Sequence, residues 1–171
     1  MKIKKNKINK VLIALDFDPS SHKVAETGFA MAKAMDAKVI LVHVKVHLVN
    51  YSLTYKKMGS IKLDNVEELA LAAENFLKNS KHHLEDNLIQ TLVKEGDFAV
   101  SILEAAKEMA VDLIVMGSHS NRWVEEIVMG RVTNKFLQQS RIPLLIIPTR
   151  KRDKSNTFIS LGNNFPIDSG V

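Results

Sequence analysis

Residues 11–21 read VLIALDFDPSS, and this stretch decides the fold. Its first five residues form an uninterrupted apolar run, which predicts a strand buried on both faces, as in a parallel sheet. The run stops at Asp16, and Pro19 suits the first position of a helix. Because a strand leads directly into a helix here, the stretch predicts the first unit of an α/β domain.

The same alternation continues along the rest of the chain. Further buried strands are predicted at 39–46 (VILVHVKV), 111–117 (VDLIVMG) and 143–148 (PLLIIP), with a weaker candidate near an edge at 88–93 (LIQTLV). Apolar residues at helical spacing predict helices after Pro19, over 66–84, after a cap at Asp97 and over about 130–139. Strands that alternate with helices predict right-handed crossovers and a doubly wound parallel sheet.

The composition limits the function classes. With 171 residues the chain fits one domain, which we place at 11–149 between a basic segment at 1–10 and a tail at 150–171. The absence of cysteine excludes disulfides, Cys-ligated zinc and thiol catalysis. No apolar run reaches the roughly 20 residues of a membrane span, and the run at 11–15 is too short for a secretory signal. We therefore expect a cytoplasmic protein with no membrane partner.

The formal net charge of +5 lies on the two ends of the chain. Residues 1–10 hold five lysines and no acid, and residues 150–154 hold four basic residues and one acid. The domain between them is slightly acidic, so the positive charge is typical of solvated flanks that aid solubility. We do not expect nucleic acid to be a partner.

In an open parallel sheet, ligands bind beyond the carboxyl ends of the strands, where the strand order reverses. One loop there begins with Asp16-Phe17-Asp18. Two carboxylates at a strand end could hold Mg²⁺ and supply a nucleophile, as in the HAD phosphotransferases, but the loop GSHSNRW after Met116 contains no acid. The alternative is that Asp18 caps the following helix and Asp16 serves a neighbouring turn.

A second loop carries glycines at both ends. Gly117 ends a predicted strand and Gly130 opens a predicted helix, with GSHSNRW following the strand. A glycine lets a ligand approach the backbone, and a helix start presents N–H groups to an anion. The loop therefore indicates a phosphate cradle, although two glycines alone also serve simple turns.

The segments MGSHS at 116–120 and MGRVTNKFLQQSRIPLLIIP at 129–148, with VLIALDFDPSS and VILVHV, resemble the universal stress protein family. The resemblance runs from about Lys10 to Pro148. It implies a Rossmann-like sandwich, similar to the adenine nucleotide alpha-hydrolases, with five parallel strands flanked by helices. One branch of the family binds ATP through three glycines, spaced by two and then nine residues, followed by Ser or Thr; another branch lacks the pattern.

This chain keeps the spacing of that motif but departs from it at two positions. The glycines correspond to Gly117, Ser120 and Gly130, and the final hydroxyl position is Arg131. Ser120 would cost about 1 kcal/mol if a positive φ is needed there. Arg131 either clamps phosphates or occupies the cradle, and Thr133 offers a substitute hydroxyl.

The resemblance also assigns contacts outside the glycine motif. It implies that Asp16 accepts hydrogen bonds from the ribose, that the Val44 backbone recognises the adenine edge and that Met116 packs on the base. His119 and Val132 would lie beside the phosphates. The other histidines have simpler interpretations: His43 as a core residue, and the pair at 82–83 as solvated side chains rather than metal ligands.

Together these observations predict a regulatory stress-response module that binds ATP, ADP or AMP, with or without Mg²⁺. No catalytic residues and no metal ligands are assigned, and no efficient turnover is expected. A dimeric stress scaffold that binds no nucleotide is the alternative, and a phosphotransferase using Asp16 and Asp18 is a remote one. The apolar run from Ile142 to Ile147 would be exposed as a sheet edge, so we expect a homodimer through it, besides an unidentified protein partner.

Overall fold

The computed structural model describes residues 7–45, 66–118, 136 and 138–149. Within them, five strands form one parallel sheet in the order β3-β2-β1-β4-β5. The strands are β1 Lys10–Ala14, β2 Lys38–Lys45, β3 Gln90–Glu95, β4 Leu113–Gly117 and β5 Leu144–Ile147. The helices are α1 Ser21–Ala34, α3 Val66–His83 and α4 Phe98–Glu108. The predicted α/β fold with a five-stranded parallel sheet is confirmed.

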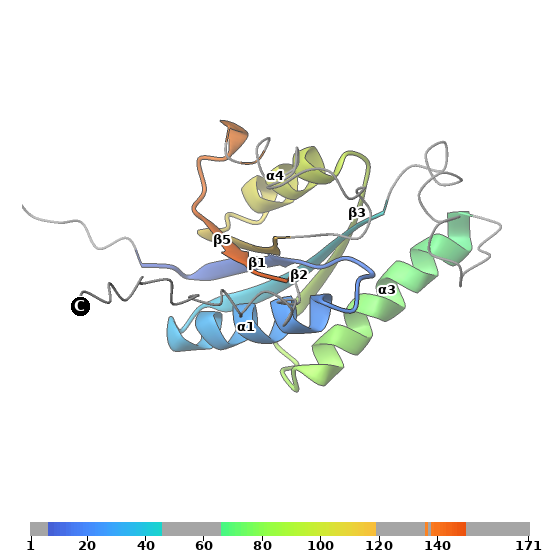
Figure 1. The fold of residues 1–171 in the computed structure, drawn as a ribbon, viewed down its shortest axis with the longest axis horizontal. Coiled ribbons are helices and arrows are strands. Elements are labelled where there is room, and N and C mark those ends of the chain that lie inside the picture. The colour runs from blue at the N-terminus through green and yellow to red at the C-terminus, as the bar shows by residue number, and fades with distance from the viewer. Residues whose placement is uncertain (1–6, 46–65, 119–135, 137, 150–171) are drawn as a thin grey trace, which may run out of the picture.

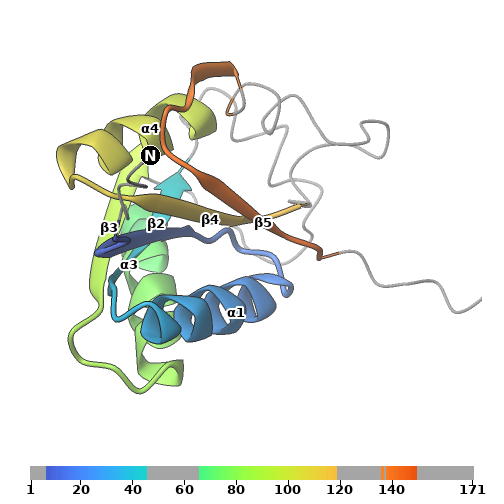
Figure 2. The same ribbon diagram turned by 90° about the vertical axis from the view of Figure 1, so that its left-hand side faces the viewer.

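The helices form a layer on each side of the sheet. In Figures 1 and 2, α1 and α3 cover one face and α4 covers the other. The chain leaves the central strand β1 toward β2 and β3, then returns to β1's other side for β4 and β5. The strand order therefore reverses between β1 and β4, and that is where such sheets bind ligands.

The predicted elements agree with the observed ones, with small shifts at their ends. The weak candidate at 88–93 is β3, which forms one edge of the sheet as expected. The expected helix start at Pro19 is wrong by two residues, because the backbone oxygen of Asp18 accepts from the Ser21 N–H and places Pro19 in a turn. Of the helix predicted over about 130–139, only 136, 138 and 139 lie within the described residues, and these three are helical.

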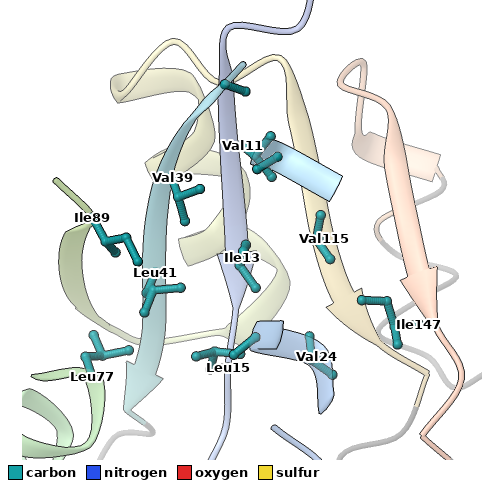
Figure 3. Packing of buried hydrophobic residues seen from close by; sticks show 13 residues of the cluster. Val11, Ile13, Leu15, Val24, Val39, Leu41, Leu77, Ile89, Val115 and Ile147 are labelled. Atoms are coloured by element: carbon teal, nitrogen blue, oxygen red, sulfur yellow. The ribbon is translucent and has the colours of Figure 1, made fainter. Parts of the chain in front are cut away.

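The face of the sheet under α1 and α3 holds one apolar cluster, shown in Figure 3. Val11, Ile13 and Leu15 contribute to it from β1 and the residue after it. Gly28 of α1 lies so close to this face that an added Cβ would stand 2.9 Å from Ile13 Cδ1 and 3.1 Å from Val115 Cγ1. The glycine thus sets how closely α1 approaches the sheet.

The opposite face holds a second cluster under α4. Ile102 and three alanines of α4 are buried there together with Phe136, whose ring lies 6.3 Å from that of Phe98. The cap predicted at Asp97 is confirmed, since its Oδ1 accepts from the Val100 N–H at 3.0 Å. The two clusters together bury the central strand on both sides, as its continuous apolar run predicts.

Candidate functional site

The candidate site lies at the carboxyl ends of β1 and β4, the two neighbouring strands between which the order reverses. Asp16 follows β1 by two residues and Gly117 is the last residue of β4. The parallel register Ile13↔Val115 places these two strand ends side by side. The structure therefore places the first residues of the two loops that the sequence singles out next to each other.

Asp16 is a half-buried carboxylate held by hydrogen bonds. Its Oδ1 lies 2.8 Å from the hydroxyl of Ser21 and 3.3 Å from the backbone N–H of Asp18, which donates to it. The Ser21 hydroxyl also lies 2.6 Å from the Asp16 carbonyl and accepts from the Asp16 N–H at 3.1 Å. Among the described residues, none hydrogen-bonds to the other carboxylate oxygen, Oδ2. A fixed carboxylate with one available oxygen is suited to accept from a hydroxyl group.

His43 ties the end of β2 to the residue that precedes Asp16. Its side chain is 1% exposed, and its Nδ1 lies 2.9 Å from the carbonyl oxygen of Leu15. Because a carbonyl only accepts, Nδ1 carries the proton in this contact. The ring also packs against Phe17 at 4.5 Å and Phe76 of α3 at 5.6 Å. The interpretation of His43 as a core histidine is confirmed, and its hydrogen bond supports the candidate site.

Val44 and Met116 lie on the opposite face of the sheet from His43. Both side chains are buried in the cluster under α4, with Val44 1% and Met116 4% exposed. Val44 belongs to the carboxyl-terminal part of β2, and Met116 precedes the last residue of β4. Both residues therefore lie near the carboxyl ends of their strands, as Asp16 does. Any contact with a base would use their backbone or the small exposed part of their side chains.

A set of polar contacts joins the ends of β4 and β5 to α1. The Ser118 N–H donates to the Ile147 carbonyl at 2.8 Å, and the Thr149 N–H donates to the Ser118 hydroxyl at 3.1 Å. Lys23, in the first turn of α1, donates from Nζ to the Pro148 carbonyl at 2.6 Å. These contacts hold the backbone that leads into the candidate cradle, at Ser118, against the residues that follow β5.

The remaining predicted site residues lie outside the described residues. They are His119, Ser120, Gly130, Arg131 and Val132. Thr133 is outside them as well. Their roles at the phosphate end therefore stay predictions, including whether Arg131 clamps or occupies the cradle.

Asp18 supports a turn rather than a second functional carboxylate. Its Oδ1 accepts from the Ser20 N–H at 2.7 Å. The residue at the helix cap is Ser20, without a side-chain capping bond, so the prediction that Asp18 caps the helix is wrong. Within the described part of the chain, no group of three His, Asp or Glu side chains is arranged to hold a metal ion.

Sequence reasoning missed the residues that fix the site from behind. Ser21 is buried and holds Asp16, and Lys23 binds the chain after β5. Both lie within or next to the stretch at 11–21, and a serine at the start of a helix is a weak signal for a contact with the preceding turn. Ser118 was within the quoted loop, but its partner Thr149 could be found only from the pairing of β4 with β5.

The fold and this site define a Rossmann-like α/β protein with its candidate site at the switch between β1 and β4. Residues 7–148 match the model of the universal stress protein family, and the chain belongs to that family. Universal stress protein A of Yersinia pestis is 29% identical over 141 residues, covering 82% of this chain and 91% of the relative. The solved structure of hypothetical protein MJ0577 is 27% identical with a TM-score of 0.63, covering 85% of this chain and 98% of the other.

Two further solved structures share the fold and contain a nucleotide. One is a universal stress protein in complex with cAMP, 18% identical with a TM-score of 0.59, covering 85% of this chain and 100% of the other. The other is a family protein from Arabidopsis thaliana with AMP bound, 19% identical with a TM-score of 0.56, covering 87% of this chain and 96% of the other.

In the part of this chain that the structure describes, no helix has the length and apolar character needed to span a bilayer.

Proposed function

We propose that this universal stress protein is a cytoplasmic regulatory module that binds an adenine nucleotide, ATP, ADP or AMP, at the switch between β1 and β4. The observation that carries the proposal is the Asp16 carboxylate, which Ser21 holds through Oδ1 while Oδ2 has no hydrogen-bond partner among the described residues. Ribose hydroxyls are donors of the kind that this oxygen accepts. The residues present therefore fit the ribose of a nucleotide.

The base and the phosphates would extend to either side of Asp16. The adenine edge would meet the backbone of Val44 and the margin of Met116, at the ends of β2 and β4. The phosphates would lie over Gly117 and the loop to Gly130, and any Mg²⁺ would enter with them. Family proteins solved with cAMP and with AMP support this choice of ligand class.

The nucleotide is bound as a signal rather than turned over efficiently. The hydrogen bonds of the two acids at the site support this. Asp16 Oδ1 accepts from the Ser21 hydroxyl and the Asp18 N–H, and Asp18 Oδ1 accepts from the Ser20 N–H. A phosphotransferase would need both carboxylates directed at the reacting phosphate and its metal. Mg²⁺-dependent phosphatase activity that is lost in Asp16→Asn would contradict this part of the proposal.

Calorimetric titration with ATP, ADP and AMP tests the nucleotide site. We expect saturable binding to the wild type and a loss of about tenfold or more in Asp16→Ala, because a charged hydrogen bond contributes about 1.5–3 kcal/mol. Glu104→Ala, an exposed acid on α4, is the control with the same charge change and should bind as the wild type does. No binding at millimolar nucleotide would favour the scaffold without nucleotide.

Arg131→Ser examines the departure from the family motif. If the arginine occupies the cradle, the variant binds ATP more tightly while its affinity for adenosine is unchanged. An unchanged or weaker affinity for ATP would show that Arg131 does not exclude phosphate. Comparing the two ligands separates an effect on phosphate from an effect on the adenosine end.

We also propose that the protein is a homodimer that pairs through β5. This strand is the sheet edge opposite β3, and its Leu144, Leu145 and Ile146 are only half-buried within the described chain. An uncovered apolar edge strand tends to pair with another strand, and a two-fold dimer would bury it in both copies. Light scattering at micromolar concentration should give the mass of a dimer, and a monomer would contradict the proposal.

A further inference from the structure

A groove lies along the edge of the sheet that β3 forms, away from the candidate nucleotide site. It has a volume of about 720 Å³ and lies between α3 and β3, which pack against each other. Figures 1 and 2 show α3 lying beneath β2 and β3, at the end of the sheet opposite β5. Neither Asp16 nor Gly117 lines this groove.

The groove has an apolar floor between polar walls. Leu92 and Val93 of β3 are half-buried and supply apolar surface on the two sides of the strand, whereas Leu77 of α3 adjoins the groove but is completely buried. Thr91, two residues before Val93, lies on the same side of the strand. This alternation along β3 matches the alternating side chains of another extended segment.

β3 presents an open backbone edge beside this floor. It pairs with β2 on one side, and among the described residues no strand pairs with its other side. The strand contains no proline, so no residue of Gln90–Glu95 lacks a backbone N–H. Such an edge offers N–H and C=O groups to an added strand.

The wall of the groove on α3 is basic. Lys78, Lys81 and His82 line it at positions that share one side of the helix, against a single acid, Glu74. Within the described residues neither lysine has an ion-pair partner within 4.0 Å. Asp86 accepts hydrogen bonds from the Leu88 N–H and Lys33, and its attraction to Lys81 is the weakest of the effects that lower the pKa of this carboxyl.

The charges on β3 itself are already paired. Lys94 contacts Glu108 of α4 at 2.6 Å, and Glu95 contacts Lys45 of β2 at 2.8 Å. The unpaired positive charge beside the edge therefore comes from α3 alone. A partner with acidic side chains would supply the missing counter-charges.

We propose that this groove is a docking site for an extended acidic peptide segment of a partner protein, which adds as a strand to β3. Its backbone pairs with the edge, acidic side chains on the side facing α3 meet Lys78 and Lys81, and the alternate apolar side chains lie on the other side of the strand, toward Leu92. A single-stranded nucleic acid fits less well, because such ligands stack on aromatic side chains and no Phe, Tyr or Trp is among the described residues that line the groove. The proposal does not depend on nucleotide binding.

The test uses the full chain and a fluorescein-labelled peptide of about six residues in which Glu and Val alternate, the usual length of a strand. We expect saturable binding by fluorescence anisotropy that weakens as salt is raised. Hydrogen exchange should show new protection of the amides in Gln90–Glu95. Protection there distinguishes an added strand from loose electrostatic contact with α3.

Charge reversal on the groove wall is the matched variant. Lys78→Glu with Lys81→Glu should weaken peptide binding about tenfold or more, because two attractive contacts become repulsive. Lys38→Glu with Lys107→Glu makes the same change in net charge at exposed positions outside the groove and should leave binding unchanged. Asp16→Ala should also leave it unchanged, which separates this site from the nucleotide site.

Three outcomes would overturn the proposal. The first is no binding of the peptide, including the case in which other residues of this chain already fill the groove. The second is binding without protection of β3. The third is tighter binding of an oligothymidine of similar charge at the same lysines, which would assign the groove to nucleic acid instead.

Discussion

The two faces of the sheet bury similar apolar clusters but are attached to their helices in different ways. Under α1 and α3, directional polar contacts reach the strand ends, with Ser21 holding Asp16 and His43 holding the Leu15 carbonyl. Under α4 the contacts to the central strands are apolar, from small residues of the helix and from Phe136, and the polar contacts, such as Glu108 with Lys94, reach only the edge strand β3. Both faces contribute to stability, but the first also sets the orientation of the candidate site.

The difference separates two requirements of a binding protein. Apolar packing is non-directional and tolerates small shifts, whereas a hydrogen bond fixes an atom within a few tenths of an ångström. We therefore expect substitutions under α4 to change stability with little change in nucleotide affinity. Substitutions under α1 and α3 should change affinity by more than their cost in stability implies.

Phe136→Ala should give the largest loss of stability. Phe136 is completely buried under α4, so truncation removes about 3–5 kcal/mol from the free energy of unfolding through lost burial and the cavity that remains. Urea denaturation measures this loss. Val100→Ala, an exposed position on α4, is the control and should cost well under half as much. A loss below about 1 kcal/mol for Phe136→Ala would contradict the packing described here.

Gly28→Val should give the next largest loss of stability, and it acts on the face under α1 and α3. The added atoms meet Ile13 and Val115, forcing α1 away from the sheet at a cost of about 1–3 kcal/mol. Because α1 carries Ser21, nucleotide affinity should fall as well. Thermal unfolding and titration with AMP check the two effects. A variant with unchanged affinity would contradict the expectation that substitutions on this face alter nucleotide binding.

His43 tests whether the hydrogen bond or the packing matters for the site. His43→Leu keeps an apolar side chain but leaves the Leu15 carbonyl without this donor, at a cost of about 1–3 kcal/mol. His43→Asn places an amide N–H near the position of Nδ1. We expect AMP affinity to fall in the Leu variant and to be largely restored in the Asn variant. Equal affinities in both variants would assign His43 to packing alone.

Substitution of Asp86 should give the smallest change in stability, and that change depends on pH. The Leu88 N–H, followed by Lys33, lowers the pKa of this carboxyl below its usual value. A lowered pKa in the folded state means stability that is present above the unfolded pKa and is lost as the pH falls through the folded one. Asp86→Asn should therefore be slightly less stable than the wild type at neutral pH, with the difference vanishing in acid.

Chemical denaturation at pH 7 and at about pH 3 measures this difference. Glu104→Gln removes a charge from an exposed position on α4 and is the control. A stability difference for Asp86→Asn that stays constant across this range would show that the charge of Asp86 is not its cause. The contact itself ties α1 to the loop after α3, on the face with directional contacts.

The fold was largely predictable because each central strand is a continuous apolar run that only a sheet covered on both faces can bury. Helix starts were less predictable, because they depend on contacts such as that of Asp18 with Ser21, which displaced the start from Pro19. The sequence also indicated the edge position of β3 through its partial alternation.

The candidate site was predictable in its location but not in its supports. The carboxyl ends of β1 and β4 follow from the topology, and Asp16 and Gly117 lie there. The donors behind them, such as Ser21 and His43, come from a helix and a neighbouring strand whose relative rotation no local pattern encodes. Ser120 and Arg131 lie outside the described part of the chain, so their roles stay predictions.

The position of β1 at the centre of the sheet has a consequence for folding kinetics. Its pairing with β2 joins segments that are near in sequence, whereas its pairing with β4, as in Val11↔Leu113, closes a long loop. Long-range pairs carry a larger entropic cost before they form, so we expect the half from β1 to β3 to assemble first. The candidate site at the carboxyl ends of β1 and β4 then forms late, and a ligand bound there would slow unfolding rather than accelerate folding.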